Sequence, residues 1–104
     1  MNLPQVLTDL IAAQNNFDSA AYAHCFSATA VVFDEGKTHI GKAAIKNWIT
    51  KANETYKAVM KPIDYSEIQQ TLEAEISGNF PGSPLVLTYQ FEFEDGQIQS
   101  LKIV

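Results

Sequence analysis

The chain contains no arginine, a single cysteine and no long run of hydrophobic residues. Its seven basic residues are all lysines, and its formal net charge is −5. Nucleic acids are bound by clustered basic residues, and arginine supplies the two-pronged hydrogen bonds that recognise phosphates and bases. The composition therefore predicts no nucleic-acid partner.

Cys25, the lone cysteine, has no partner for an internal disulfide, which is typical of a reducing compartment. The opening Met1-Asn2-Leu3-Pro4 lacks the basic segment and apolar core of a secretory signal. No apolar run approaches the roughly 20 residues needed to span a bilayer. We therefore expect a cytoplasmic protein that does not associate with membranes.

A length of 104 residues predicts one domain, residues 1–104, without linkers or internal repeats. Hydrophobic residues make up 46% of the sequence, which is typical of a globular domain with a buried core. No zinc-ligand spacing, phosphate-binding loop or dinucleotide fingerprint occurs, so we expect no metal and no cofactor.

Three helices are predicted in the first half of the chain, where apolar residues recur at three- and four-residue spacing. They cover residues 3–15, 19–26 and 42–56. Asp18 fits the N-cap of the second helix, because its carboxylate can accept a backbone N–H there. Residues 30–34 and 37–40 form two short paired strands, and the unbroken run Val31-Val32-Phe33 predicts a strand covered on both faces.

After Tyr56 the period of the apolar residues changes from that of a helix to the strict alternation of strands. Four strands are predicted, around residues 59–65, 72–77, 85–93 and 98–103, with Asp95-Gly96 as a hairpin turn. Helices followed by hairpin-linked strands indicate an α+β fold, with three helices on one concave face of a curved antiparallel sheet. Leu87, Phe91, Ile45 and Trp48 are expected in the shared core.

Four short segments occur in an order that is informative. They are Asn16-Phe17-Asp18, Ala30-Val31-Val32-Phe33-Asp34, Gly41-Lys42-Ala43-Ala44-Ile45 and Phe93-Glu94-Asp95-Gly96-Gln97-Ile98. Their order and spacing resemble the nuclear transport factor 2-like superfamily, which includes SnoaL-type polyketide cyclases and ketosteroid isomerases. The resemblance covers nearly the whole chain. It implies a cone-shaped, cystatin-like fold with an apolar cavity between helices and sheet, commonly in a homodimer.

Asp34 is the first candidate site residue. It stands where similar ketosteroid isomerases carry a proton-shuttling aspartate, so the resemblance implies a general base for proton abstraction next to a carbonyl. A carboxylate partly desolvated at a cavity mouth has a raised pKa that suits this role. The same side chain can instead contact a ligand without reacting, or bond backbone amides in the turn Asp34-Glu35-Gly36.

Tyr89 and His39 are candidate catalytic partners of Asp34. By the resemblance, the oxyanion-hole tyrosine of the family falls at Leu10, and its second donor, a protonated aspartate, falls at Tyr89. Loss of such a donor costs about 10²–10³ in rate, so steroid isomerisation is not expected. Tyr89 would donate to a ligand oxygen, or else be a core aromatic. His39 would be an acid partner or proton shuttle, or else a partly exposed strand residue.

Large side chains are also predicted to line the cavity and bind the ligand, although plain core packing is favoured for any one of them alone. They are Tyr22, Phe26, Trp48, Tyr56, Phe80 and Phe91.

Three functions remain open on the sequence alone. The domain binds a small apolar ligand that bears a carbonyl or carboxyl group. Alternatively, it is an isomerase, cyclase or lyase that uses Asp34 as its base, or a non-catalytic protein-interaction domain. Because one acid stands with few convergent partners, the sequence favours ligand binding.

Overall fold

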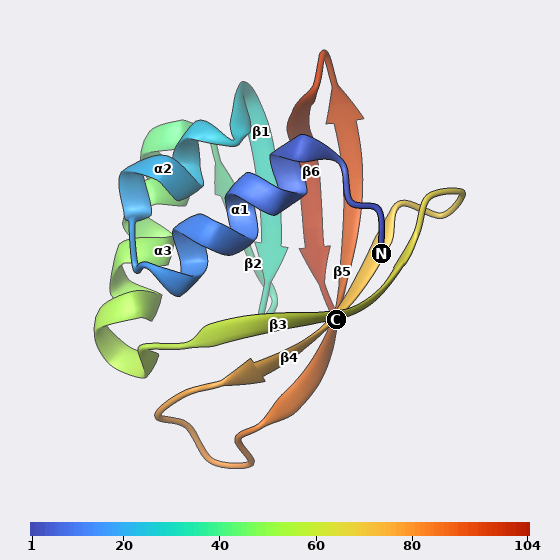
Figure 1. The fold of residues 1–104 in the computed structure, drawn as a ribbon. Coiled ribbons are helices and arrows are strands. Elements are labelled where there is room, and N and C mark those ends of the chain that lie inside the picture. Colours follow the sequence, from blue (N-terminus) through green and yellow to red (C-terminus); the bar gives the residue numbers. More distant parts are fainter.

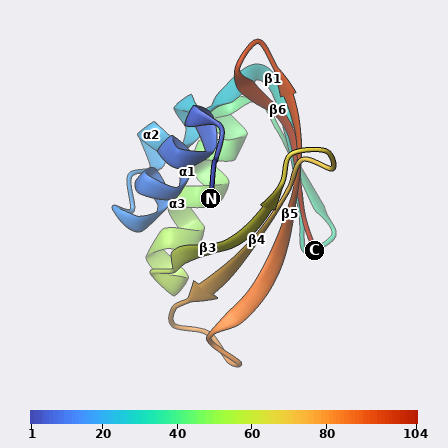
Figure 2. The same ribbon diagram turned by 45° about the vertical axis from the view of Figure 1, so that its right-hand side comes forward.

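The computed structural model describes all 104 residues, Met1–Val104. Three helices cover one face of a curved six-stranded sheet (Figure 1, Figure 2), so the predicted α+β fold is confirmed. The elements are α1 (Gln5–Asn15), α2 (Ser19–His24), β1 (Phe26–Asp34), β2 (Lys37–Ile40), α3 (Lys42–Tyr56), β3 (Val59–Ser66), β4 (Thr71–Ser77), β5 (Leu85–Glu94) and β6 (Gln97–Ile103). None of the helices has the length and hydrophobicity required to cross a bilayer.

The strands lie in the order β2-β1-β6-β5-β4-β3. β1 and β6 pair in parallel, whereas all other neighbours are antiparallel. The sheet is therefore mixed, and the prediction of a purely antiparallel sheet is wrong at this one junction. Hairpin turns fix the antiparallel direction of strands that follow each other in the chain. β1 and β6 are far apart in the sequence, so no turn fixes their relative direction.

The second helix ends earlier than predicted, at His24, and Phe26 begins β1. Phe26 pairs with Ile98 of β6, and the Ile98 N–H donates to the Cys25 carbonyl at 2.9 Å. Phe26 is also fully buried, so strand pairing and burial override the helical spacing of its side chain. The cap at the other end is confirmed, because the Asp18 carboxylate accepts the Ala21 N–H at 3.0 Å.

The helices cover only the inner face of the sheet, which corrects the prediction for the run Val31-Val32-Phe33. Val32 is fully buried beneath the helices, whereas the Phe33 side chain is 42% exposed on the outer face. Alternation along a strand sends successive side chains to opposite faces, so an unbroken apolar run does not require cover on both.

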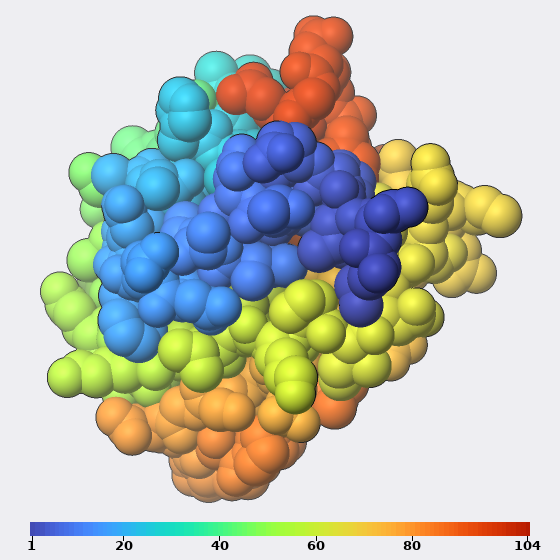
Figure 3. All heavy atoms as spheres, viewed as in Figure 1, coloured from blue at the N-terminus to red at the C-terminus, as the bar shows by residue number.

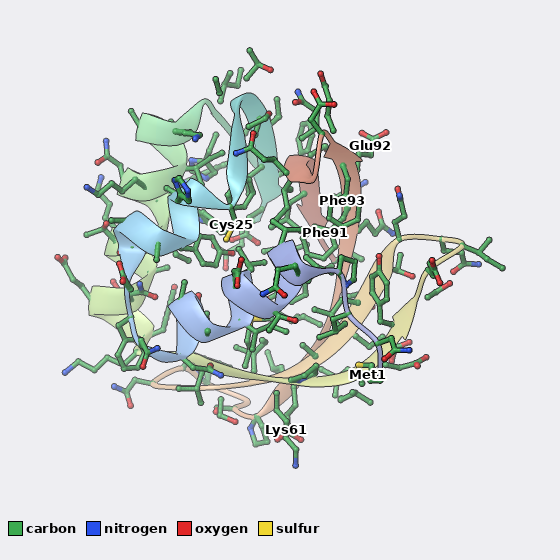
Figure 4. The ribbon with its side chains drawn as sticks, turned by 45° about the horizontal axis from the view of Figure 1, so that its top comes forward. Met1, Cys25, Lys61, Phe91, Glu92 and Phe93 are labelled. Atoms are coloured by element: carbon green, nitrogen blue, oxygen red, sulfur yellow. The ribbon has the colours of Figure 1, made fainter.

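The core fills the space between the helices and the inner face of β1, β6, β5 and β4. Its largest fully buried side chains are Phe26, Leu7, Leu10, Ile45, Leu72, Ile98, Leu101 and Val32. Phe91 points inward from β5 while its neighbour Glu92 points away (Figure 4), and Ile45 is fully buried as expected. Trp48 and Leu87 are only half-buried, because they line a cavity instead of the closed core.

Helix α1 is fastened across β3 by one asparagine. The Asn15 side chain donates to the Met60 carbonyl at 3.1 Å and accepts the Met60 N–H at 2.7 Å. In the space-filling view the blue residues of α1 lie against the yellow-green residues of β3 (Figure 3). This contact fixes where the end of α1, including Gln14, meets the sheet.

The outer face of the sheet carries exposed charged residues such as Glu73 and Glu92, together with exposed Phe33 and Ile40. The resemblance implies that this face joins two copies of the chain. The homodimer stays a prediction.

Leu101→Ala should lower the free energy of unfolding by about 2–5 kcal/mol, because it opens a cavity in the fully buried centre of the sheet. Ile40→Ala removes a side chain that is 68% exposed and should cost less than about 1 kcal/mol. Urea denaturation of both variants measures the difference. Equal losses would contradict the assignment of Leu101 to the core.

Candidate functional site

A cavity of about 580 Å³ opens between α3, the inner face of the sheet and the segment that follows β4. Small-molecule sites commonly have volumes of roughly 300–1,000 Å³ and mostly apolar walls. The apolar wall includes Trp48, Ile49, Ile76, Leu85, Leu87 and Ile103. The cavity therefore has the size and lining of a small-molecule site.

The parallel pairing of β1 with β6 places Asp34 in this cavity. Phe33 is level with Lys102, so Asp34 is level with Ile103, and Ile103 is level with Tyr89 on β5. Neighbouring strands lie about 4.8 Å apart, so one strand, or about 10 Å, separates the backbones of Asp34 and Tyr89. Both side chains line the cavity from the same face of the sheet.

Tyr22 joins these two residues from α2, across the cavity from the sheet. Its ring lies 6.1 Å from the ring of Trp48, and its side chain is 2% exposed. Neither the Tyr22 nor the Tyr89 hydroxyl forms a hydrogen bond with a protein group. Every side-chain nitrogen or oxygen atom that is fully shielded from solvent does have a hydrogen-bond partner. Both hydroxyls are therefore open to the cavity that they line.

Burial raises the pKa of the Asp34 carboxyl above its ordinary value, and the neighbouring charge of Glu35 raises it further. Three weaker effects oppose the rise: the nearby Trp48 side chain, the proximity of His39, and the backbone N–H of Glu35. Asp34 is thus half-buried at the end of β1, and the turn is made by Glu35 and Gly36. The Asp34 carboxylate therefore takes up a proton at a higher pH than the carboxylate of an exposed aspartate.

The two tyrosines are neutral hydrogen-bond donors. Burial raises the pKa of the Tyr22 hydroxyl, and the nearby Tyr89 and Asp34 raise it further. The pKa of Tyr89 is likewise raised by burial and by Asp34. Neither hydroxyl therefore ionises near neutral pH, and each keeps a proton to donate.

His39 does not line the apolar cavity. Its ring stacks on Trp48 at a centroid distance of 5.5 Å and an interplanar angle of 28°. It lies in an adjoining hollow of about 460 Å³, which it shares with Asp34, Lys37 and Lys51. The structure thus places His39 on β2 against Trp48, in the hollow next to the cavity, while Tyr89 faces the cavity itself. Its role as acid partner stays a prediction.

Four of the six predicted lining residues do line the cavity, namely Tyr22, Trp48, Tyr56 and Phe80. Phe26 and Phe91 do not, which corrects that expectation of their placement. Phe26 is fully buried in the core, and Phe91 is stacked between Tyr89 at 6.3 Å and Phe93 at 5.6 Å. Leu10, where the tyrosine of the family would fall, is also fully buried in the core.

One rim of the cavity is the segment after β4, which is held against the end of α3 by Gly78. A Cβ atom at Gly78 would lie 2.6 Å from the Tyr56 carbonyl oxygen, so only glycine permits this approach. The Asn79 N–H donates to the same carbonyl at 2.7 Å, and Phe80 packs edge-on against Tyr56 at 6.0 Å. These contacts place Phe80 over the cavity.

Two polar lining residues, Gln14 and Asn53, were missed by the sequence analysis. Both side chains are 8% exposed, and the Gln14 amide nitrogen donates to the Asn53 side-chain oxygen at 3.2 Å. Gln14 lies four residues after the buried Leu10, and Asn53 lies four residues after the buried Ile49. Their positions on the apolar faces of helices are a signal that could have identified both.

Metal-binding residues and the one thiol of the chain are further candidates for parts of a functional site. No three histidine, cysteine, aspartate or glutamate residues are arranged so that they could hold a metal ion. Burial raises the pKa of the Cys25 thiol to about 11, and its sulfur donates to the Ala21 carbonyl at 3.5 Å. Cys25 is consequently a protonated packing residue and a poor nucleophile near neutral pH.

The carboxyl ¹³C signal of Asp34 should titrate with a midpoint above the ordinary value of 3.8. Because the folded protein then binds this proton more tightly than the unfolded chain, stability present at lower pH is lost as the pH rises through the folded pKa. Asp34→Asn removes that loss, so its stability relative to the unmodified protein should increase across this pH range. Asp64→Asn, at an exposed position on β3, controls for the loss of one negative charge. An Asp34 midpoint at or below 3.8 would contradict the burial of the carboxylate.

Several solved structures are similar to this chain. A protein from Sinorhizobium meliloti, provisionally named a polyketide cyclase, is 36% identical, with a TM-score of 0.91 over 98% of this chain and 95% of that one. A protein with a ketosteroid isomerase-like fold from Catenulispora acidiphila, solved with trimethylamine, is 19% identical, with a TM-score of 0.82 over 99% and 86%. A nuclear transport factor 2-like protein of unknown function from Cytophaga hutchinsonii is 15% identical, with a TM-score of 0.77 over 100% and 90%.

No family model and no curated protein matches the chain. The two more distant structures show the fold alone, whereas the Sinorhizobium protein is a relative over nearly the full length of both chains. The fold, the position of the cavity and this relative agree with the resemblance of the four sequence segments. The chain belongs to the nuclear transport factor 2-like superfamily.

Proposed function

We propose that the cavity binds a small, largely apolar molecule through a carbonyl or carboxyl oxygen, which accepts hydrogen bonds from Tyr22 and Tyr89. The observation that carries this proposal is the pair of buried, neutral hydroxyls that open on the cavity without a protein partner. Because both hydroxyls reach the cavity, a ligand oxygen between the two tyrosines can replace the water that otherwise accepts their hydrogen bonds.

A neutral carbonyl fits the site better than an ionised carboxylate. Asp34 lies close enough to both tyrosines to raise their pKa values, so its negative charge also acts on any ligand oxygen between them. Two negative charges in such a cavity repel each other strongly. The Sinorhizobium relative supports the same preference, since polyketides are carbon chains with repeated carbonyl groups.

A second candidate function is proton abstraction next to that carbonyl, and the raised pKa of Asp34 favours it. The Asp34 carboxylate would take a proton from the carbon beside the carbonyl, and the C–H electron pair would move into an enolate. Tyr22 and Tyr89 would stabilise the negative charge on the enolate oxygen, as donors in an oxyanion hole do. The product would form when the proton returns to the same or another carbon.

2-Acetylnaphthalene, an apolar aromatic ketone, is a suitable probe of binding. Tyr22→Phe and Tyr89→Phe should each weaken its Kd about tenfold, because each removes one hydrogen bond to the ketone oxygen. Isothermal titration calorimetry measures the Kd, and quenching of Trp48, the only tryptophan, reports that the probe lies in the cavity.

Tyr65→Phe is the matched control for these variants. Tyr65 lies on β3 and does not line the cavity, so this variant should bind the ketone as tightly as the unmodified protein. Absence of ketone binding, or equal affinity in all three tyrosine variants, would contradict the proposed role of Tyr22 and Tyr89.

Catalysis can be tested without the natural substrate, by exchange of the methyl protons of 2-acetylnaphthalene in D₂O. If Asp34 is a general base, the protein should accelerate this exchange above the pKa of Asp34, and Asp34→Asn should abolish the acceleration while ketone binding remains. Proton NMR follows the loss of the methyl signal. No acceleration by a protein that binds the ketone leaves binding as the function.

A further inference from the structure

We propose that the ligand has two polar ends, and that its second end is a neutral hydroxyl group that donates a hydrogen bond to Gln14. This inference rests on the proposed function, because it assigns the first end to Tyr22 and Tyr89. It adds a second anchor, formed by Gln14 and Asn53 in another part of the same cavity.

The Gln14 side chain presents an acceptor and no free donor. Its amide nitrogen donates to the Ala58 carbonyl at 2.7 Å and to the Asn53 side-chain oxygen at 3.2 Å. A carbonyl oxygen only accepts hydrogen bonds, so the contact with Ala58 fixes which end of the amide is nitrogen. Both amide hydrogens are therefore used within the protein.

The remaining atom, Oε1 of Gln14, accepts from no protein group. All side-chain polar atoms that are fully shielded from solvent have a hydrogen-bond partner. Oε1 has none, so it is not shielded and is open to the cavity that Gln14 lines. The side chain itself is only 8% exposed. A buried acceptor of this kind is satisfied by a donor on the ligand, or by a water molecule that the ligand displaces.

The amide pair is held rigidly. Asn53 accepts from Gln14 and donates to the Ser19 hydroxyl at 3.3 Å, so the network joins α1, α3 and the start of α2. Its geometry fixes the direction of the Gln14 acceptor before any ligand arrives. A pre-positioned polar group of this type selects for a ligand that carries its complement.

Contacts with α3 indicate that the two anchors lie at different heights in the cavity. Tyr22 of the first anchor packs on Trp48. Asn53 of the second anchor, which bonds Ser19, lies five residues further along α3. At 1.5 Å per residue this separation is about 7.5 Å along the helix axis. A bicyclic skeleton with an oxygen at each end has a suitable length.

The charges lining the cavity favour a hydroxyl over an ammonium group at the second end. Asp34 and Glu35 are the only charged residues among the lining side chains; Asp34 ends β1 and Glu35 follows it in the turn. A cationic ligand group would be drawn to that end, away from Gln14. A neutral hydroxyl donates to Gln14 without that competition.

Three ketones that differ only at the far end of naphthalene test the inference by calorimetry with the unmodified protein. They are 2-acetylnaphthalene, its 6-hydroxy derivative and its 6-methoxy derivative. The hydroxy ketone should bind about tenfold more tightly than the parent, because it adds one hydrogen bond to a buried acceptor. The methoxy ketone, which only accepts, should bind no better than the parent.

Gln14→Met should abolish the advantage of the hydroxy ketone, while Gln90→Met, the same change at an exposed position on β5, should preserve it. Gln14→Met also removes hydrogen bonds to Ala58 and Asn53, so this variant can fail to fold. In that case the comparison of the three ketones on the unmodified protein tests the inference by itself. Binding of all three ketones with equal Kd overturns this inference alone. Binding of none overturns both this inference and the proposed function.

Discussion

The parallel pairing of β1 with β6 is the contact on which the site depends. It brings the end of β1 level with the end of β6, and β6 is level with Tyr89 of β5. Asp34 therefore reaches the inner face of the sheet beside a buried hydroxyl that lies 55 positions later in the chain. If β6 paired with β1 in the opposite direction, the two ends would separate and the carboxylate would lose Tyr89 as a neighbour.

The helices divide the inner face into a closed part and an open part. α1 and α2 cover the part where Phe26, Ile98 and Leu101 are fully buried. Beneath α3 and the segment after β4, Trp48, Phe80 and Leu87 are only half-buried and a cavity remains. Among its polar groups, the Gln14 and Asn53 amides are held by hydrogen bonds to neighbouring elements, so this part of the cavity is shaped before a ligand enters. Such preorganisation reduces the entropy cost of binding.

The sequence predicted most elements, because periodicity, caps and turns are local signals. Asp18 caps its helix, and the alternation after Tyr56 corresponds to β3–β6. The end of α2 and the direction of β1 against β6 were not predictable, since both depend on pairing between distant segments. The site was predicted in part. Asp34, Tyr89 and four lining aromatics meet in one cavity, whereas Gln14 and Asn53 were not predicted.

Infrared spectroscopy tests the central claim, that Tyr22 and Tyr89 converge on one ligand oxygen, most directly. The stretching frequency of a ¹³C-labelled carbonyl in 2-acetylnaphthalene falls when hydrogen bonds weaken its C=O bond. In the bound state it should lie below its value in an apolar solvent, by a shift that Tyr22→Phe and Tyr89→Phe each reduce. A bound ketone whose carbonyl frequency equals that in the apolar solvent would contradict the account.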